Sequence, residues 1–180
     1  MNKLAVVFVA LTVLTGQTRP DFSRPDMITG PAEIIDGDTL KVGDVKIFLF
    51  GIDAPELDQQ CRIFGLDWPC GERSRVWLAR YIGGKPVRCL PEPAPEDYRG
   101  PGLKAICFNF RTINMNAAMV GEGMAIPNLA ESDRYRAART SARIQLRGFW
   151  AGETIEPALW RQGKRFTTRA KSLRRNRLRP

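Results

Sequence analysis

Apolar and polar positions between residues 34 and 56 predict a twisted β-hairpin, and the rest of the chain is organised around it. Residues 39–42 are expected to form one strand and residues 45–50 the returning strand. Between them, Gly43-Asp44 is a two-residue turn of the kind that matches the twist of paired strands. The pattern therefore indicates a rigid hairpin with polar side chains near its ends.

Helices and further strands are expected after this hairpin. Helical spacing predicts a helix at residues 72–82, which Gly83-Gly84 ends. The other expected elements are a loop at residues 56–71, strands at residues 86–90 and 103–110 around a turn-rich segment at residues 91–102, a short helix at residues 116–124, and a third helix that Ser132 or Asp133 caps and that runs to about Arg147. Short strands interrupted and followed by helices indicate the α+β class.

Residues 1–20 have the layout of a secretory signal peptide. Lys3 precedes an almost wholly apolar run at residues 4–14, and small and polar residues follow. This run is too short to span a bilayer comfortably, so no membrane span is expected; an N-terminal strand or buried helix is the alternative. We therefore expect an exported protein, periplasmic or secreted, with a linker at residues 21–30.

The net charge of +9 belongs to the C-terminal end of the chain. Residues 161–180 carry nine Lys and Arg and no acid, which leaves 19 basic and 19 acidic residues in the first 160. We interpret residues 161–180 as a basic tail that binds nucleic acid or another polyanion, with Lys164, Arg165, Arg174 and Arg175 among the contacts. A merely solubilising tail is the alternative.

Three carboxylates are expected to converge at the hairpin. Asp38 lies on the outgoing strand, Asp53 just past the returning strand, and Glu56 beyond Pro55. Carboxylate oxygens on rigid strand ends and loops suit Ca²⁺. Each acid taken alone could instead be a solvated turn residue. The chain contains no histidine, which excludes histidine catalysis and histidine metal ligation.

Cys61, Cys70, Cys89 and Cys107 form an even set in a chain that is expected to be exported, which favours disulfides. Four cysteines allow three pairings. A zinc site with four cysteine ligands is the competing idea, but the chain has no Cys-x-x-Cys pair.

Two motifs carry a family resemblance. Asp36-Gly37-Asp38-Thr39, followed by Gly51-Ile52-Asp53-Ala54-Pro55-Glu56, resembles the staphylococcal nuclease (thermonuclease-like) family. The similarity covers about residues 31–160 and is greatest to a secreted bacterial branch with four cysteines, some of whose members are named succinoglycan biosynthesis proteins. It includes the runs that begin at Trp68, Asn116 and Arg147.

The resemblance implies a five-stranded OB-type β-barrel with three helices at residues 31–160, expected to be a monomer without an organic cofactor. Order along the chain favours the pairs Cys61–Cys70 and Cys89–Cys107, and the four-cysteine branch implies the same pairing. Each disulfide would contribute about 2–4 kcal/mol to stability.

The resemblance also implies a chemistry. In that family Ca²⁺ and a carboxylate assist the attack of water on a phosphodiester, while two arginines stabilise the charge on the phosphorus oxygens. Asp38 and Asp53 are thereby implied as ligands of a Ca²⁺ cofactor, and Ala54 as the source of a carbonyl ligand. Glu56 is implied as the water-orienting carboxylate or general base.

Neither arginine occupies the position that the resemblance assigns to it. The first position, five residues before Asp53, is Phe48, with Lys46 on the same strand face. The second falls on Pro101 or Gly102, and Arg99 is near. Losing one transition-state donor typically lowers the rate by about 10²–10³.

We therefore expect a weak or inactive phosphodiesterase that acts as a polyanion- or partner-binding domain. The alternative is an active Ca²⁺-dependent nuclease that uses Arg99 or Lys46 as replacement cations. A third hypothesis is an envelope scaffold or assembly factor that uses the fold as a rigid body.

Overall fold

The computed structural model describes residues 26–93 and 101–167 of the chain. The predicted signal peptide, most of the predicted linker, Arg99, Arg174 and Arg175 lie outside these residues. Among the described helices, none is long and apolar enough to cross a membrane.

One bent strand nearly closes the central sheet into a barrel. β1 (Ile28–Gly30) and β2 (Ala32–Ile34) are separated only by Pro31, yet they lie at opposite ends of the strand order β1-β8-β9-β4-β3-β2. β1 pairs with β8 (Val87–Pro91) and β2 pairs with β3 (Thr39–Val42), both antiparallel. Pro31 has no N–H to donate, which suits the break between the two pairings. Counting the bent segment once, the barrel has five strands, as the OB-type prediction requires.

The predicted hairpin is confirmed. β3 pairs with β4 (Val45–Leu49) so that Val42 lies opposite Val45 and Thr39 opposite Phe48. Gly43 in the turn has a φ of 58°, a conformation that glycine adopts without steric cost. The other neighbour of β4 is β9 (Leu103–Phe108), and this pair is parallel.

Four α-helices and one 3₁₀-helix are present in the described part of the chain, where three helices were predicted. They are α1 (Cys70–Ile82), α2 (Met115–Gly121), α3 (Arg136–Ile144), the 3₁₀-helix η1 (Gly148–Ala151) and α4 (Pro157–Arg161). The extra helices are too short to leave a helical period in the sequence.

The predicted cap of α3 is wrong. The helix begins at Arg136, and no side chain caps its N-terminus. The hydroxyl of Ser132 instead accepts a hydrogen bond from the N–H of Arg134 in the turn before the helix. Asp133 contributes through its backbone carbonyl, which accepts from the N–H of Arg136.

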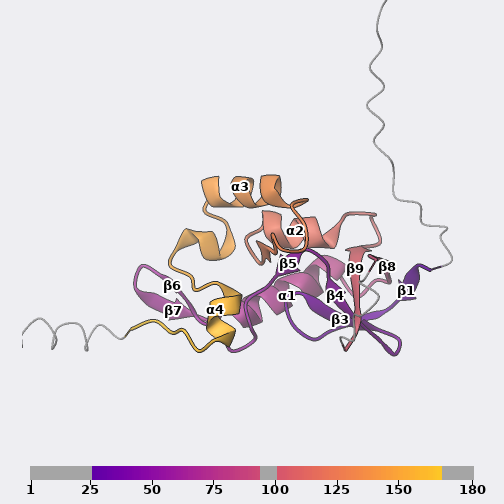
Figure 1. The fold of residues 1–180 in the computed structure, drawn as a ribbon, viewed down its shortest axis with the longest axis horizontal. Coiled ribbons are helices and arrows are strands. Elements are labelled where there is room, and N and C mark those ends of the chain that lie inside the picture. Colours follow the sequence, from indigo (N-terminus) through magenta and orange to yellow (C-terminus); the bar gives the residue numbers. More distant parts are fainter. Residues whose placement is uncertain (1–25, 94–100, 168–180) are drawn as a thin grey trace, which may run out of the picture.

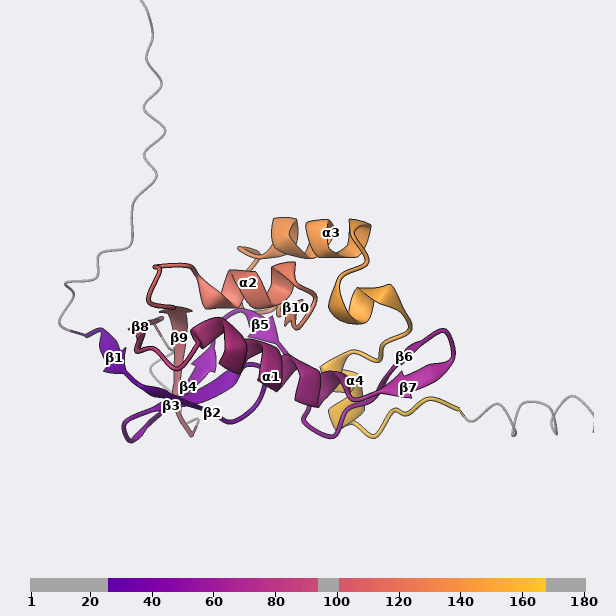
Figure 2. The same cartoon turned by 180° about the vertical axis from the view of Figure 1, so that it is seen from behind.

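The segment expected to be a loop between Glu56 and Gly71 contains a second hairpin. β6 (Cys61–Ile63) and β7 (Leu66–Trp68) pair antiparallel around Phe64-Gly65. This hairpin projects from the end of the molecule opposite the barrel (Figures 1 and 2). The pair β5 (Ile52–Asp53) and β10 (Ile126–Pro127) forms a third sheet, of two strands.

The hydrophobic core fills the barrel and the space under α1 and α2. Its fully buried members come from several strands and both helices and include Leu40, Ile47, Leu78, Val87 and Met119. α2 contacts β9 and α1, and α3 lies over α2 on the outer side (Figure 1).

Both predicted disulfides are present. Cys89 and Cys107 lie directly opposite each other on β8 and β9. Cys61–Cys70 joins the start of β6 to the start of α1 and closes the base of the projecting hairpin. All four cysteines are buried, and none is free to bind zinc.

Candidate active site

A cavity of about 270 Å³ opens where the β3–β4 hairpin meets the loop after β5. Its wall combines acidic, apolar and cationic side chains: Asp36, Asp38, Asp53, Glu56, Glu131, Phe48, Leu49, Ile52, Pro55, Lys104 and Arg161, together with Thr39 and Ala54. Three of the acids are those that the sequence singled out, so the fold brings them to one cavity.

Asp38 is held in the cavity wall by two hydrogen bonds. Its Oδ2 accepts a hydrogen bond of 2.6 Å from the N–H of Ala54, and its Oδ1 accepts one of 3.1 Å from the hydroxyl of Thr39. Burial, and then the neighbouring charge of Asp36, raise the pKa of Asp38 from its ordinary 3.8 to about 8. In the absence of a bound cation, Asp38 is therefore largely protonated at neutral pH.

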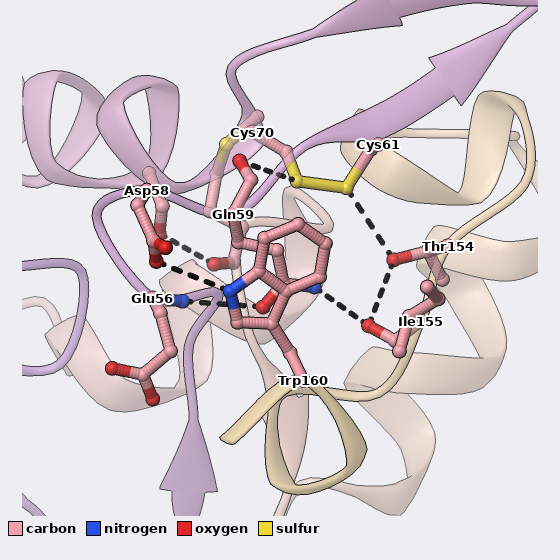
Figure 3. Close-up of a disulfide and its surroundings, with 10 residues drawn as sticks. Glu56, Asp58, Gln59, Cys61, Cys70, Thr154, Ile155 and Trp160 are labelled. Carbon is pink, nitrogen blue, oxygen red and sulfur yellow. Dashed lines mark hydrogen bonds between the residues drawn. A yellow bond between two sulfur atoms is a disulfide. The ribbon is translucent and has the colours of Figure 1, made fainter. Parts of the chain in front are cut away.

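The backbone around Glu56 is held by a fully buried glutamine. Gln59 accepts from the N–H of Glu56 through Oε1 at 3.2 Å and donates through Nε2 to the carbonyl of Ile155 at 2.6 Å. Figure 3 shows this glutamine between the Glu56 loop, the Cys61–Cys70 disulfide and the segment that leads to α4. The disulfide and Gln59 thus fix the position of Glu56.

Close packing of α1 against the same loop adds to this constraint. A Cβ atom at Gly71 would lie only 1.6 Å from the carbonyl oxygen of Glu56. Glycine at this position is therefore required for the approach of the helix to the loop, and the Trp68–Gly71 run acquires a structural role.

Arg161, at the end of α4, contacts two acids of the site. Its Nη1 donates to Asp53 Oδ1 at 2.9 Å and to Glu56 Oε1 at 2.6 Å, while its Nη2 donates to Asp53 Oδ2 at 2.9 Å. This fork engages both oxygens of Asp53, a bidentate geometry that suits arginine. The hydrogen bonds to Asp53 raise the pKa of Arg161 above its usual value.

A second cation, Lys104, also lines the cavity. Lys104 of β9 is in register with Phe48 of β4 across the parallel pair. The Lys104 ammonium donates to Glu131 Oε1, and Glu131 Oε2 accepts from the N–H of Gly51 at 3.0 Å. Phe48 therefore has a lysine beside it, and that lysine is paired with an acid.

The family assignment rests on a comparison of the sequence. A model of the staphylococcal nuclease homologue family matches residues 46–152. The chain belongs to this family. Its membership places the protein among nuclease-type domains, a class of hydrolases, and agrees with the OB-type barrel. Asp53 and Glu56 lie within the matched residues, whereas Asp38 and Arg161 lie outside them.

A curated relative is also similar over most of the chain. It is the "Succinoglycan biosynthesis protein ExoI" of Rhizobium meliloti (strain 1021), which is 28% identical over 147 residues. The alignment covers 80% of this chain and 75% of that protein.

The acids in the described arrangement do not form a calcium site. Both oxygens of Asp53 accept from Arg161, and those of Asp38 accept from Ala54 and Thr39. Within residues 26–93 and 101–167, no group of three or more acidic or cysteine side chains is close enough to hold a metal ion. Carboxylate oxygens are suitable ligands for Ca²⁺, but in this arrangement those of Asp53 bind the guanidinium of Arg161.

Other residues named from the sequence have different places. Lys46 lies with its ammonium 5.0 Å from the centre of the Phe48 ring and does not line the cavity. Arg165 lies over the ring of Trp160, and Lys164 is exposed. Sequence reasoning missed Lys104 and Arg161 as cavity residues. The parallel pairing of β4 with β9 could have indicated Lys104, whereas no local signal indicated Arg161.

Proposed function

We propose that the protein is an exported nuclease-family domain that binds polyanions and hydrolyses phosphodiesters weakly or not at all. One observation carries this proposal: each cation that lines the cavity, Lys104 and Arg161, is paired with a carboxylate. The family resemblance adds that Phe48 occupies a position at which an arginine is expected. Without a cation directed at the phosphate, charge developing on its oxygens has no fixed partner among these groups.

The carboxylates themselves can still take part in chemistry. Glu56 is held by Gln59 and lies at the cavity, so it could orient a water or accept a proton. In the described arrangement, however, its Oε1 accepts a hydrogen bond from Arg161 at 2.6 Å, so that oxygen is already engaged by the protein. This contact supports slow turnover even where a phosphodiester enters the cavity.

A digest of single-stranded DNA tests the proposal. Purified protein, with both disulfides intact, should cleave DNA in Ca²⁺ at a rate at least about 10²-fold below that of an intact family member, by analogy with the loss of one transition-state donor. Efficient cleavage that Glu56→Ala abolishes would instead favour the active Ca²⁺-dependent nuclease, with Arg99 or Lys46 as the replacement cation.

Restoring the missing cations provides a positive control. Phe48→Arg with Pro101→Arg should raise the rate, because Phe48 lines the cavity and Pro101 is exposed just before β9, the neighbour of β4. Gly102 is unsuitable for this purpose. A Cβ atom there would lie 2.5 Å from the carbonyl oxygen of Lys46, so an arginine would push β4 away from the residues that lead into β9.

Polyanion binding is tested by a truncation after Thr167, which keeps α4 and removes Arg169, Lys171, Arg174, Arg175, Arg177 and Arg179. We expect weaker binding to single-stranded DNA and a smaller salt dependence, by about 0.7 in slope for each lost contact. An anionic polysaccharide is the second probe, since the similar protein is named for succinoglycan biosynthesis. Unchanged affinity for both polymers would assign binding to the folded domain.

A further inference from the structure

The contact between α4 and the acidic site is a network of three hydrogen bonds rather than a single ion pair. Arg161 makes three hydrogen bonds to two carboxylates, and the side chain of Asp53 is only 16% exposed. Charge-assisted and bidentate bonds of this kind are stronger than ordinary hydrogen bonds, and partial burial reduces their screening by salt. The guanidinium therefore neutralises two acids that would otherwise repel each other.

The helix that carries this arginine is held by its neighbours. α4 has five residues, too few to be stable alone in water. Trp160 is buried, and its indole N–H donates to Asp58 Oδ1 at 3.1 Å (Figure 3). The guanidinium of Arg165 lies 3.6 Å from the centre of the Trp160 ring and donates to the Trp160 carbonyl at 2.8 Å. These contacts place Arg161 over the loop of Asp53 and Glu56.

We infer that the guanidinium of Arg161 is the resident cation of the Asp53–Glu56 site, and that a divalent cation binds there only after displacing it. Ca²⁺ needs carboxylate oxygens, and Arg161 already engages both oxygens of Asp53 and one of Glu56. The two cations therefore compete for one site. When Arg161 is displaced in only a fraction of the molecules, the apparent affinity for Ca²⁺ equals the intrinsic affinity multiplied by that fraction.

Pairing of Arg161 with Asp53 and Glu56 gives a second reason for slow hydrolysis, and in this respect the inference rests on the proposed function. The competition itself concerns cation binding alone and can be measured without any substrate. Arg161 also lies beyond the residues that the family model matches, so the contact is a feature of this chain's C-terminal segment.

The test is a calcium titration of full-length protein by isothermal calorimetry, comparing wild type with Arg161→Gln. We expect Arg161→Gln to bind Ca²⁺ at least about tenfold more tightly, which corresponds to about 1.4 kcal/mol. Arg161→Lys should lie between the two, because an ammonium keeps the charge but loses the bidentate fork. Lys85→Gln is the matched control: it removes one positive charge from an exposed position outside the cavity, and its affinity should equal that of wild type.

Folding of each variant is checked by near-ultraviolet circular dichroism. Folded Arg161→Gln protein that binds Ca²⁺ no more tightly than wild type would overturn the inference. If Arg161→Gln does not fold, an Arg161→Lys affinity equal to or below that of wild type would overturn it as well. A DNA digest by wild type separates the two proposals: efficient cleavage refutes weak turnover whatever the titration shows, and slow cleavage with unchanged calcium affinity refutes only the competition.

Discussion

Replacing Asp38 with asparagine should remove the pH dependence that this acid imposes on stability. In the unfolded chain the Asp38 carboxyl ionises near its ordinary pKa of 3.8, whereas in the folded protein burial keeps it protonated up to about pH 8. Between these values folding takes up a proton, so the free energy of unfolding falls as the pH rises. Below about pH 4 and above about pH 8 the contribution of Asp38 is constant.

The size of this effect follows from the pKa difference. Each unit of pKa shift corresponds to about 1.4 kcal/mol, so the full window sets an upper bound of about 6 kcal/mol. We expect the difference in unfolding free energy between Asp38→Asn and wild type to grow by roughly 2 kcal/mol or more from pH 5 to pH 8. Asparagine is nearly isosteric, and its side-chain oxygen can still accept from the N–H of Ala54.

Urea denaturation with intact disulfides and EDTA, repeated between pH 4 and pH 8.5, measures this difference. Asp44→Asn serves as the control, because it removes a fully exposed carboxylate from the turn of the same hairpin. Its stability difference from wild type should not change with pH. Parallel curves for wild type and Asp38→Asn would show that Asp38 ionises normally in the folded protein and would refute the reasoning.

Two further substitutions test the support of the site. In Gly71→Ala the new Cβ must move about 2 Å away from the carbonyl of Glu56. Overpacking of this kind should lower the free energy of unfolding by about 1–3 kcal/mol, measured by heat or urea. Gly121→Ala is the control: its Cβ would meet nothing within 4 Å, so the change should be neutral or stabilising. Trp160→Phe loses the bond to Asp58 and should cost about 1 kcal/mol or more, with faster hydrogen exchange of the α4 amides. Unchanged exchange would mean that other contacts hold α4.

The central hairpin could be predicted because its signals are local, whereas the five-stranded barrel was implied by the family resemblance. Gly43-Asp44 is a turn whose chemistry is set by two adjacent residues, and the strands on either side follow from the pattern next to it. The β6–β7 hairpin was missed for the same reason. Its turn is Phe64-Gly65, and Phe64 adopts a φ of 51° where asparagine, aspartate or glycine would have signalled a turn.

The acids of the site could be predicted, but their partners could not. Asp38, Asp53 and Glu56 fall in two adjacent motifs, so the hairpin alone brings them to one place. Arg161 is 108 residues from Asp53 in sequence, on a helix of five residues with no detectable period. Nothing local distinguishes it from the basic residues that follow, and the sequence grouped it with them.

A site that lacks cations in its expected positions can still obtain them from elsewhere in the fold. The five acids around the cavity would repel one another if all were ionised and unpaired. The fold meets this in three ways: Asp38 keeps its proton, Glu131 pairs with Lys104 beside Phe48, and Arg161 bridges Asp53 and Glu56. Cations used for this purpose are engaged by protein carboxylates. Lys104 and Arg161 therefore pair with protein carboxylates instead of with a bound phosphate. An arginine added to the cavity would bind a phosphate only if no protein carboxylate paired with it.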